Sequence, residues 1–412
     1  MKPLFIPFSS TLQERSVEIV TAQYVEKLRG LYERTLPVIT SVEDLNKYEG
    51  EIRRAPLIFA LACTGGTSRL MIALEKFRRP VVILSHGKQN SLPSALEALH
   101  MLRLRKYPVT LVHDLSSRSL RTLKKLSTIG EALHDLYSAR ILLIGASEDW
   151  LRSENYDIER ITELFGVNIE WEPLEAFVEK VSKATKDEDF IQYFSRLPKA
   201  EINNEAIEDS SRIYVVTTEL MREKSAGSIG IRCFPIIMKT KITPCLTISR
   251  LIDEGVPATC EADLSANILM ILLMRISGAP VFMGNTVDIK ESEVVFAHCT
   301  VSTKFARNVV LRKHFETEWS VSIAGMLEEG DTITFARFSH DLRKLLAGKG
   351  KIVRGIPWSE EFCRTQILVS VDGDASKIIR EPVGNHFVIA RGDYLEELRI
   401  LAELFDIRFE KI

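Results

Sequence analysis

Residues 57–68, LIFALACTGGTS, decide the fold class, because a buried-type apolar run ends in a glycine turn ahead of a helical pattern. Apolar runs alternate with helical patterns in the same way from residue 1 to residue 137, which is typical of βα units on a parallel sheet. The expected strands are residues 3–7, 36–40, 57–63, 81–85 and 109–113. Five such strands predict a Rossmann-like, doubly wound domain of the flavodoxin type over residues 1–137.

A second strand, turn and helix order begins at residues 140–145, RILLIG, and continues with a helical pattern over residues 158–165. It predicts a second Rossmann-like α/β domain over residues 138–280, which carries Glu261. After Pro280 the pattern changes to alternating strands between Gly and Asp turns. Residues 281–412, with His386, are therefore expected to form a C-terminal β-rich, antiparallel, barrel-like domain that ends in a helix capped by Asp393.

The overall charge excludes some classes of partner. The 412 residues include 54 basic and 56 acidic side chains, a net charge of −2, so no bulk charge favours nucleic acid or an anionic membrane. The most apolar window, residues 268–276, is shorter than the ~20 residues that span a bilayer. The N-terminus is unlike a secretory signal, and the six cysteines form no Cys-x-x-Cys pair. We expect a cytoplasmic protein that binds a small molecule.

The glycine turn at residues 64–68, TGGTS, offers backbone amides at a helix start to an anion or a sugar hydroxyl. It matches neither dinucleotide-binding nor P-loop spacing, so a nucleotide site is not expected. A tight βα turn with no ligand is an equally good interpretation.

Several polar residues occupy positions where chemistry is expected. Glu261 precedes an almost wholly apolar helix that Asp263 is placed to cap, so Glu261 is the functional candidate of the two. Asn285 and Asp288 follow that helix at a domain boundary and offer oxygen ligands to Mn²⁺ or Mg²⁺, or are turn residues. His386 is a further candidate, because its imidazole can bind a metal and the amide of Asn385 stands next to it. Arg232 and Arg364 lie in apolar strand patterns, which implies an ion pair or an anionic ligand.

The order of these motifs resembles that of the L-fucose isomerase and L-arabinose isomerase superfamily, especially its shorter members. The likeness covers roughly residues 57–412, and the motifs at residues 64–67 and 149–151 match the family pattern more weakly than the others. It rests on seven motifs in sequence: Arg232-Cys-Phe, Pro244-Cys-Leu, Cys260-Glu-Ala-Asp, Gly278-x-Pro-x-Phe-Met, Ala297-His-Cys, Cys363-Arg-Thr-Gln and Gly384-Asn-His.

The resemblance implies an aldose–ketose isomerase that works through an ene-diol intermediate with Mn²⁺, or another divalent cation such as Mg²⁺ or Co²⁺. It also implies a homotrimer or homohexamer with active sites between subunits. The family's metal-binding glutamate and histidine carry over to Glu261 and His386, and its substrate-contacting asparagine to Asn385.

One position departs from the family pattern. Asn285 stands where the fucose isomerase pattern has a metal-binding aspartate, and an amide cannot accept a substrate proton. Glu261 then acts with Asp288, a water or another group; in an arabinose-isomerase-like alignment, Asp288 is the second carboxylate ligand and His298 joins it. Two alternatives stay open: an epimerase or lyase acting on an anionic sugar held by Arg232 or Arg364, and a sugar-binding or regulatory protein without catalysis.

Overall fold

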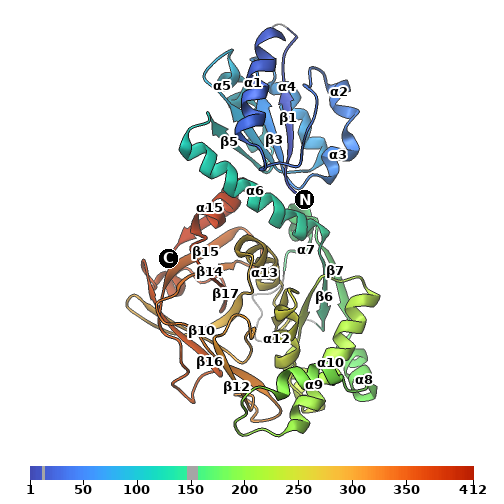
Figure 1. The fold of residues 1–412 in the computed structure, drawn as a ribbon, viewed down its shortest axis with the longest axis vertical. Coiled ribbons are helices and arrows are strands. Elements are labelled where there is room, and N and C mark those ends of the chain that lie inside the picture. The colour runs from blue at the N-terminus through green and yellow to red at the C-terminus, as the bar shows by residue number, and fades with distance from the viewer. Residues whose placement is uncertain (12–13, 146–155) are drawn as a thin grey trace. The chain divides into compact units, whose positions relative to one another are not determined.

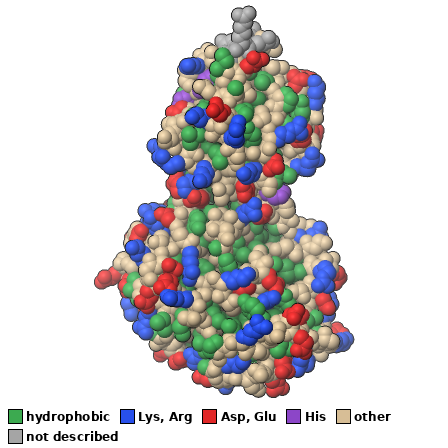
Figure 2. All heavy atoms as spheres, in the orientation of Figure 1, with side chains coloured by type: hydrophobic (Ala, Val, Ile, Leu, Met, Phe, Trp, Pro, Cys, Tyr) green, Lys and Arg blue, Asp and Glu red, His purple; other side chains and the backbone are tan. Residues whose placement is uncertain are grey.

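The computed structural model describes residues 1–11, 14–145 and 156–412, so the motif at residues 149–151 lies outside the described residues. The chain divides into two compact units. The first comprises Met1–Tyr137 and Glu396–Arg408, and the second Ser138–Leu395 and Phe409–Ile412. Within the described ranges, no helix has the length and apolarity needed to cross a membrane. Acidic and basic side chains are interspersed over the face shown in Figure 2.

The first unit is built on a parallel sheet with the strand order β2-β1-β3-β4-β5 (Figure 1). Its strands are β1 (Leu4–Phe8), β2 (Arg34–Thr35), β3 (Ile58–Ala62), β4 (Val81–Ser85) and β5 (Val109–His113). Every residue of β1, β3 and β4 is buried, as expected where helices cover both faces of a sheet. The helices are α1 (Glu14–Lys27), α2 (Val42–Asn46), α3 (Glu49–Arg54), α4 (Ser68–Ile72), η1 (Ala73–Phe77), α5 (Ser91–Leu104), α6 (Ser117–Ser138) and α15 (Leu395–Leu404).

One strand of this sheet differs from the prediction. The strand expected at residues 36–40 lies instead at Arg34–Thr35, and only Ile39 bridges to Phe8 beyond it. Pro37 interrupts the ladder, because proline has no N–H to donate.

The second unit begins with a parallel sheet in the order β7-β6-β8-β9. Its strands are β6 (Arg140–Ile144), β7 (Asn168–Glu172), β8 (Ser228–Ile231) and β9 (Ala258–Cys260). The helices are α7 (Ile158–Phe165), α8 (Leu174–Lys183), α9 (Glu188–Ser195), α10 (Asn204–Glu223), α11 (Cys233–Thr240), α12 (Cys245–Asp253) and α13 (Leu264–Ser277). The sequence context of Arg232 predicted a place inside a strand, and this is wrong. Arg232 follows β8 and precedes α11.

An antiparallel barrel completes the second unit. Its strands follow the order β14-β17-β10-β11-β16-β15, and pairing of β14 with β15 closes it. The bounds are β10 (Phe282–Lys290), β11 (Glu293–His298), β14 (Thr332–Phe338), β15 (Lys344–Arg354), β16 (Thr365–Val371) and β17 (His386–Arg391). A separate hairpin pairs β12 (Asn308–Arg312) with β13 (Ser322–Met326), and the remaining elements are α14 (Lys377–Arg380) and β18 (Arg408–Lys411).

The barrel core is aromatic and aliphatic. Phe296, Phe335 and Phe387, one from each of three strands, lie with ring centroids 5.2 to 5.8 Å apart. The mixed α/β class and the C-terminal antiparallel barrel agree with the sequence prediction.

Candidate metal centre

Glu261 stands on a tight turn between β9 and α13. Glu261 and Ala262 both have left-handed backbone angles, φ 58° and 53°, which cost non-glycine residues roughly 1–2 kcal/mol each. The Ala262 amide donates to the Ile231 carbonyl of β8 at 3.1 Å, and a Cβ on Gly230 would lie 3.1 Å from the Ala262 Cα. Gly230 thus lets the turn lie close over β8. Backbone strain of this kind is concentrated at functional sites.

Asp263, two residues further on, has two roles. Its side chain accepts a hydrogen bond from the Ala266 amide at 2.9 Å, which confirms the predicted cap of α13. The same carboxylate pairs with Arg337 of β14 and accepts from Nδ1 of His386 at 2.8 Å, and all three side chains are buried. A buried chain from arginine through aspartate to histidine therefore fixes the orientation of the imidazole.

Three ligand-type side chains meet beside this chain. One ligand atom each from Glu261, His298 and His386 lies within 4.8 Å of the other two. The Glu261 Oε1 atom is 3.6 Å from His386 Nε2, and the two imidazole centroids are 5.7 Å apart. All three residues are buried. The turn before α13, the end of β11 and the start of β17 supply them.

The protonation of the cluster follows from burial and neighbouring charge. Burial opposes a charge on His386, but Glu261 and Asp263 outweigh burial and raise the pKa of His386 to about 9. Burial, aided by the charge of His386, lowers the pKa of His298 to about 3. Burial opposes ionisation of Glu261, but His386 outweighs it and lowers the pKa of that carboxyl. At neutral pH and with no cation bound, the cluster thus holds an ionised Glu261 carboxylate, a neutral His298 imidazole and a protonated His386, which must release its Nε2 proton to bind a cation.

The donor set fits a divalent cation. Both ring nitrogens of His298 and the Nε2 atom of His386 are buried and have no hydrogen-bond partner among the described residues. Buried polar atoms without a partner are costly, and here they face one another and a carboxylate. Two imidazoles and a carboxylate, with Asp263 behind one imidazole, form the donor set of a catalytic metal site.

The predicted asparagines lie next to the cluster. Asn285 of β10 is the register partner of His386, the first residue of β17. The Asn385 amide donates to Asn285 Oδ1 at 2.8 Å. Asp288 lies three residues further along β10, beyond a bulge, and its Oδ2 atom is 3.3 Å from Lys290 Nζ. It lines a pocket with Arg354, Trp358 and other residues that do not include Glu261 or His386.

The two predicted arginines have different surroundings. Arg232 follows Ile231, whose register partner Cys260 precedes Glu261, so Arg232 and Glu261 lie at the same edge of the parallel sheet. Arg364 is buried before β16 and donates to the Lys313 carbonyl at 3.0 Å and to Glu360 and Glu318 at 2.7 and 2.8 Å.

Sequence reasoning missed the second role of Asp263 and missed Arg337 altogether. The available signal was a single arginine in the middle of an apolar strand pattern, TITFARF. Such a charge needs a buried partner, and the carboxylate that caps α13 is that partner.

A mixed α/β chain with a closed barrel and a buried carboxylate–imidazole cluster belongs to the class of folds that host small-molecule enzymes. Comparison with known proteins indicates the type of reaction. The chain is 24% identical to a sulfoquinovose isomerase from Priestia megaterium over 98% of this chain and 97% of the relative. It is 22% identical to the sulfoquinovose isomerase of a Clostridium species over 82% of this chain and 79% of the relative, and 20% identical to that of Alkalicoccus urumqiensis over 90% of each. No family model matches the chain. These relatives support a sugar isomerase.

Proposed function

We propose that this protein is a divalent-metal-dependent aldose–ketose isomerase whose substrate is sulfoquinovose or a closely related sulfonated sugar. The observation that carries the proposal is the convergence of Glu261, His298 and His386 around imidazole nitrogens that have no hydrogen-bond partner among the described residues. The relatives support the reaction class and suggest the substrate.

Glu261, His298 and His386 would hold the cation, which is Mn²⁺, Mg²⁺ or Co²⁺ in this proposal. Asn285 would add an amide oxygen, since its Oδ1 accepts one hydrogen bond from Asn385 and keeps a second lone pair. Asn385 would contact the substrate. When bound, the cation supplies polarisation of the sugar oxygens, which acidifies the adjacent carbon.

The protein side chains then handle the proton. Isomerisation removes a proton from C2, returns one to C1 and moves a proton between two oxygens. Glu261 is ionised and buried at the cluster, so we assign it as the base. Asp263 and Arg337 keep the His386 imidazole oriented while the charge at Glu261 changes. The catalytic role of Asp288 stays a prediction.

Recognition of a sulfonate group needs a positively charged side chain at the substrate pocket. Arg232 lies at the carboxyl edge of the parallel sheet, which also carries the Glu261 turn and where ligands of α/β proteins bind. We therefore assign sulfonate recognition to Arg232. Arg232→Ala is expected to raise KM for sulfoquinovose by about 10- to 100-fold, which corresponds to one charged hydrogen bond, and to leave KM for glucose unchanged.

The deciding experiment follows the purified protein with Mn²⁺ and sulfoquinovose in D₂O by NMR. We expect a ketose with deuterium at C1, and EDTA is expected to stop its formation. Glu261→Gln is expected to lower kcat by about 10²- to 10⁴-fold, the usual contribution of a general base. Glu172→Gln is the matched control, because Glu172 is also a buried glutamate of the second unit and pairs with Lys180 instead.

The outcomes separate the alternatives. Deuterium at C2 with no ketose identifies an epimerase, and cleavage products identify a lyase. Sugar binding without exchange, unchanged in Glu261→Gln, identifies a sugar-binding protein and contradicts the proposal. The homotrimeric or homohexameric state and the cytoplasmic location stay predictions, and light scattering tests the first.

A further inference from the structure

A second group of ligand-type side chains lies in the same unit and uses none of the residues of the first. One ligand atom each from Cys299, His314 and Glu316 lies within 4.8 Å of the other two. Cys299 directly follows β11, and the other two stand on the segment between β12 and β13. His314 Nε2 is 3.3 Å from Glu316 Oε2. Cys299 and His314 are buried, whereas the Glu316 side chain is 37% exposed.

Cys363 is not one of those three residues, but its thiol lies beside two of them and offers a fourth donor atom. Its sulfur is 3.6 Å from Glu316 Oε1, and its thiol also interacts with that of Cys299. Cys299 and Cys363 belong to one small apolar cluster with Cys245 and Ala297. Two thiols, one imidazole and one carboxylate are a donor set that Zn²⁺ prefers, whereas Mn²⁺ and Mg²⁺ prefer oxygen.

The imidazole is already turned toward these donors. His314 Nδ1 is 3.1 Å from the Thr317 hydroxyl, so its other nitrogen, Nε2, faces Glu316. The ring also packs edge-on against Phe234, with centroids 5.9 Å apart. A hydrogen bond at the remote nitrogen is the usual way in which a protein orients a metal-binding histidine.

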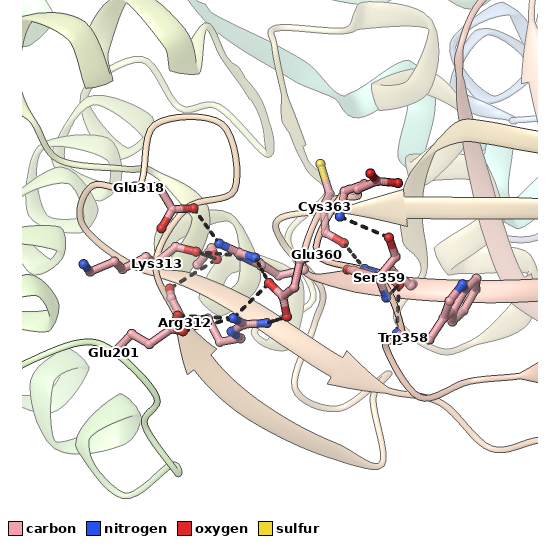
Figure 3. Close-up of polar contacts among 12 residues, drawn as sticks. Glu201, Arg312, Lys313, Glu318, Trp358, Ser359, Glu360 and Cys363 are labelled. Carbon is pink, nitrogen blue, oxygen red and sulfur yellow. Dashed lines mark hydrogen bonds and ion pairs between the residues drawn. The ribbon is translucent and has the colours of Figure 1, made fainter.

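Arg364 holds the segment that carries His314 and Glu316. Its guanidinium donates to the Lys313 carbonyl, just before His314, and to the Glu318 carboxylate, just after Glu316, and Figure 3 shows these contacts beside Cys363 and Glu360. Within the segment, the Glu318 amide donates to the His314 carbonyl at 3.0 Å. Arg364, the residue next to Cys363, therefore ties the segment that carries His314 and Glu316 to the start of β16.

We propose that Cys299, His314, Glu316 and Cys363 form a binding site for a soft divalent cation of the Zn²⁺ type, distinct from the Glu261–His298–His386 cluster. Each thiol that coordinates the cation does so as a thiolate and releases its proton to solvent. No electron transfer is involved. The exposed side of Glu316 gives the cation and the protons a route to solvent.

The test is a Co²⁺ titration of the EDTA-treated full chain, because thiolate-bound tetrahedral Co²⁺ absorbs strongly in visible and near-ultraviolet light. We expect the thiolate absorption to saturate at one thiolate-bound Co²⁺ per chain, apart from any Co²⁺ at the Glu261 cluster, which has no thiol, and Zn²⁺ to displace it. Cys299→Ser and Cys363→Ser are each expected to abolish the spectrum and to weaken Zn²⁺ binding by at least about 100-fold, more than the loss of an outer partner costs. Cys63→Ser is the matched control, since Cys63 is a buried free cysteine of the first unit.

The result is independent of the proposed isomerase. Glu261→Gln is expected to keep the thiolate spectrum, so failure of one proposal does not imply failure of the other. A parent protein without the spectrum, or a spectrum that survives Cys299→Ser but is lost in Cys260→Ser, overturns the site. Should the serine variants not fold, X-ray absorption of the Zn²⁺-loaded parent decides: sulfur scatterers next to zinc support the proposal, and a shell of only nitrogen and oxygen contradicts it.

Discussion

The two ligand clusters of the second unit orient their histidines by different means. His386 is held by Asp263, whose buried carboxylate is itself paired with the buried Arg337. His314 is held by the neutral hydroxyl of Thr317, three residues away in sequence. Breaking a buried ion pair leaves an uncompensated charge, whereas removing a hydroxyl does not. The same imidazole orientation is therefore built once from a long-range ionic chain and once from a local hydrogen bond.

The two clusters also differ in the atoms that they offer to a metal ion. The first cluster offers one carboxylate oxygen and two imidazoles, and the second offers two sulfurs, an imidazole and an oxygen. Imidazoles with a carboxylate suit borderline divalent ions such as Mn²⁺ and Co²⁺, whereas thiolates select softer ions of the Zn²⁺ type. Variants that affect one cluster and spare the other test this contrast.

The largest effect is expected from Asp263→Ala. It removes the partner of buried Arg337, the hydrogen bond to His386 and the cap of α13 together. Loss of one member of a buried pair costs about 3–5 kcal/mol, so we expect the free energy of unfolding in urea to fall by that amount. Mn²⁺ affinity is expected to fall as well.

Asp187→Ala is the control, because Asp187 caps α9 through a 2.7 Å bond from the Phe190 amide and has no such buried partner among the residues that the structure describes. Its expected cost is about 1 kcal/mol. Equal costs in the two variants would show that the Asp263–Arg337 pair adds nothing beyond helix capping.

An effect of opposite sign is expected from His298→Leu. Both His298 ring nitrogens are buried without a described partner, which costs about 1–3 kcal/mol when no cation is bound. The EDTA-treated variant is therefore expected to have a higher Tm than the EDTA-treated parent. Adding Mn²⁺ is expected to raise the Tm of the parent and not that of the variant.

His113→Leu, in the first unit, is expected to keep the full response to Mn²⁺. A metal-free His298→Leu protein less stable than its parent would mean that the imidazole has a structural role that outweighs its unpaired nitrogens.

Uniform apolar strands explain why much of the fold was predictable. Strand β4 was predicted with its observed bounds, and β3 within one residue at each end, because burial on both faces leaves a continuous apolar run. The pattern failed at β10, FMGNTVDIK, where Gly284, Asn285 and Asp288 indicate a turn. That strand is half-exposed beyond Gly284 and carries a bulge, so its alternation is broken.

The site was predictable only where a residue is unusual in its local sequence. Glu261 and His386 stand out beside an apolar helix and a glycine turn, and the structure brings them together. Arg337 is 74 residues from Asp263, and no local pattern joins them. His314 and Glu316 lie in a polar segment whose composition is that of an ordinary loop. These two residues indicate a metal site only together with the thiols of Cys299 and Cys363, and only the folded chain brings the four residues into one region.

The smallest effect on stability is expected from Thr317→Val, which tests the second cluster as Asp263→Ala tests the first. Valine keeps the shape of threonine and removes the hydroxyl at His314 Nδ1. Because that hydroxyl is neutral and part-buried, the free energy of unfolding is expected to fall by no more than about 1 kcal/mol. The imidazole loses its orienting partner, so the affinity for Co²⁺ is expected to fall by about 10-fold, the lower end of the range for outer partners of metal ligands.

Mn²⁺ binding at Glu261, His298 and His386 is expected to stay unchanged. A parallel loss of Mn²⁺ affinity would show that the two clusters form one coupled centre, and unchanged Co²⁺ affinity would show that the packing of His314 against Phe234, rather than the hydroxyl, sets its orientation.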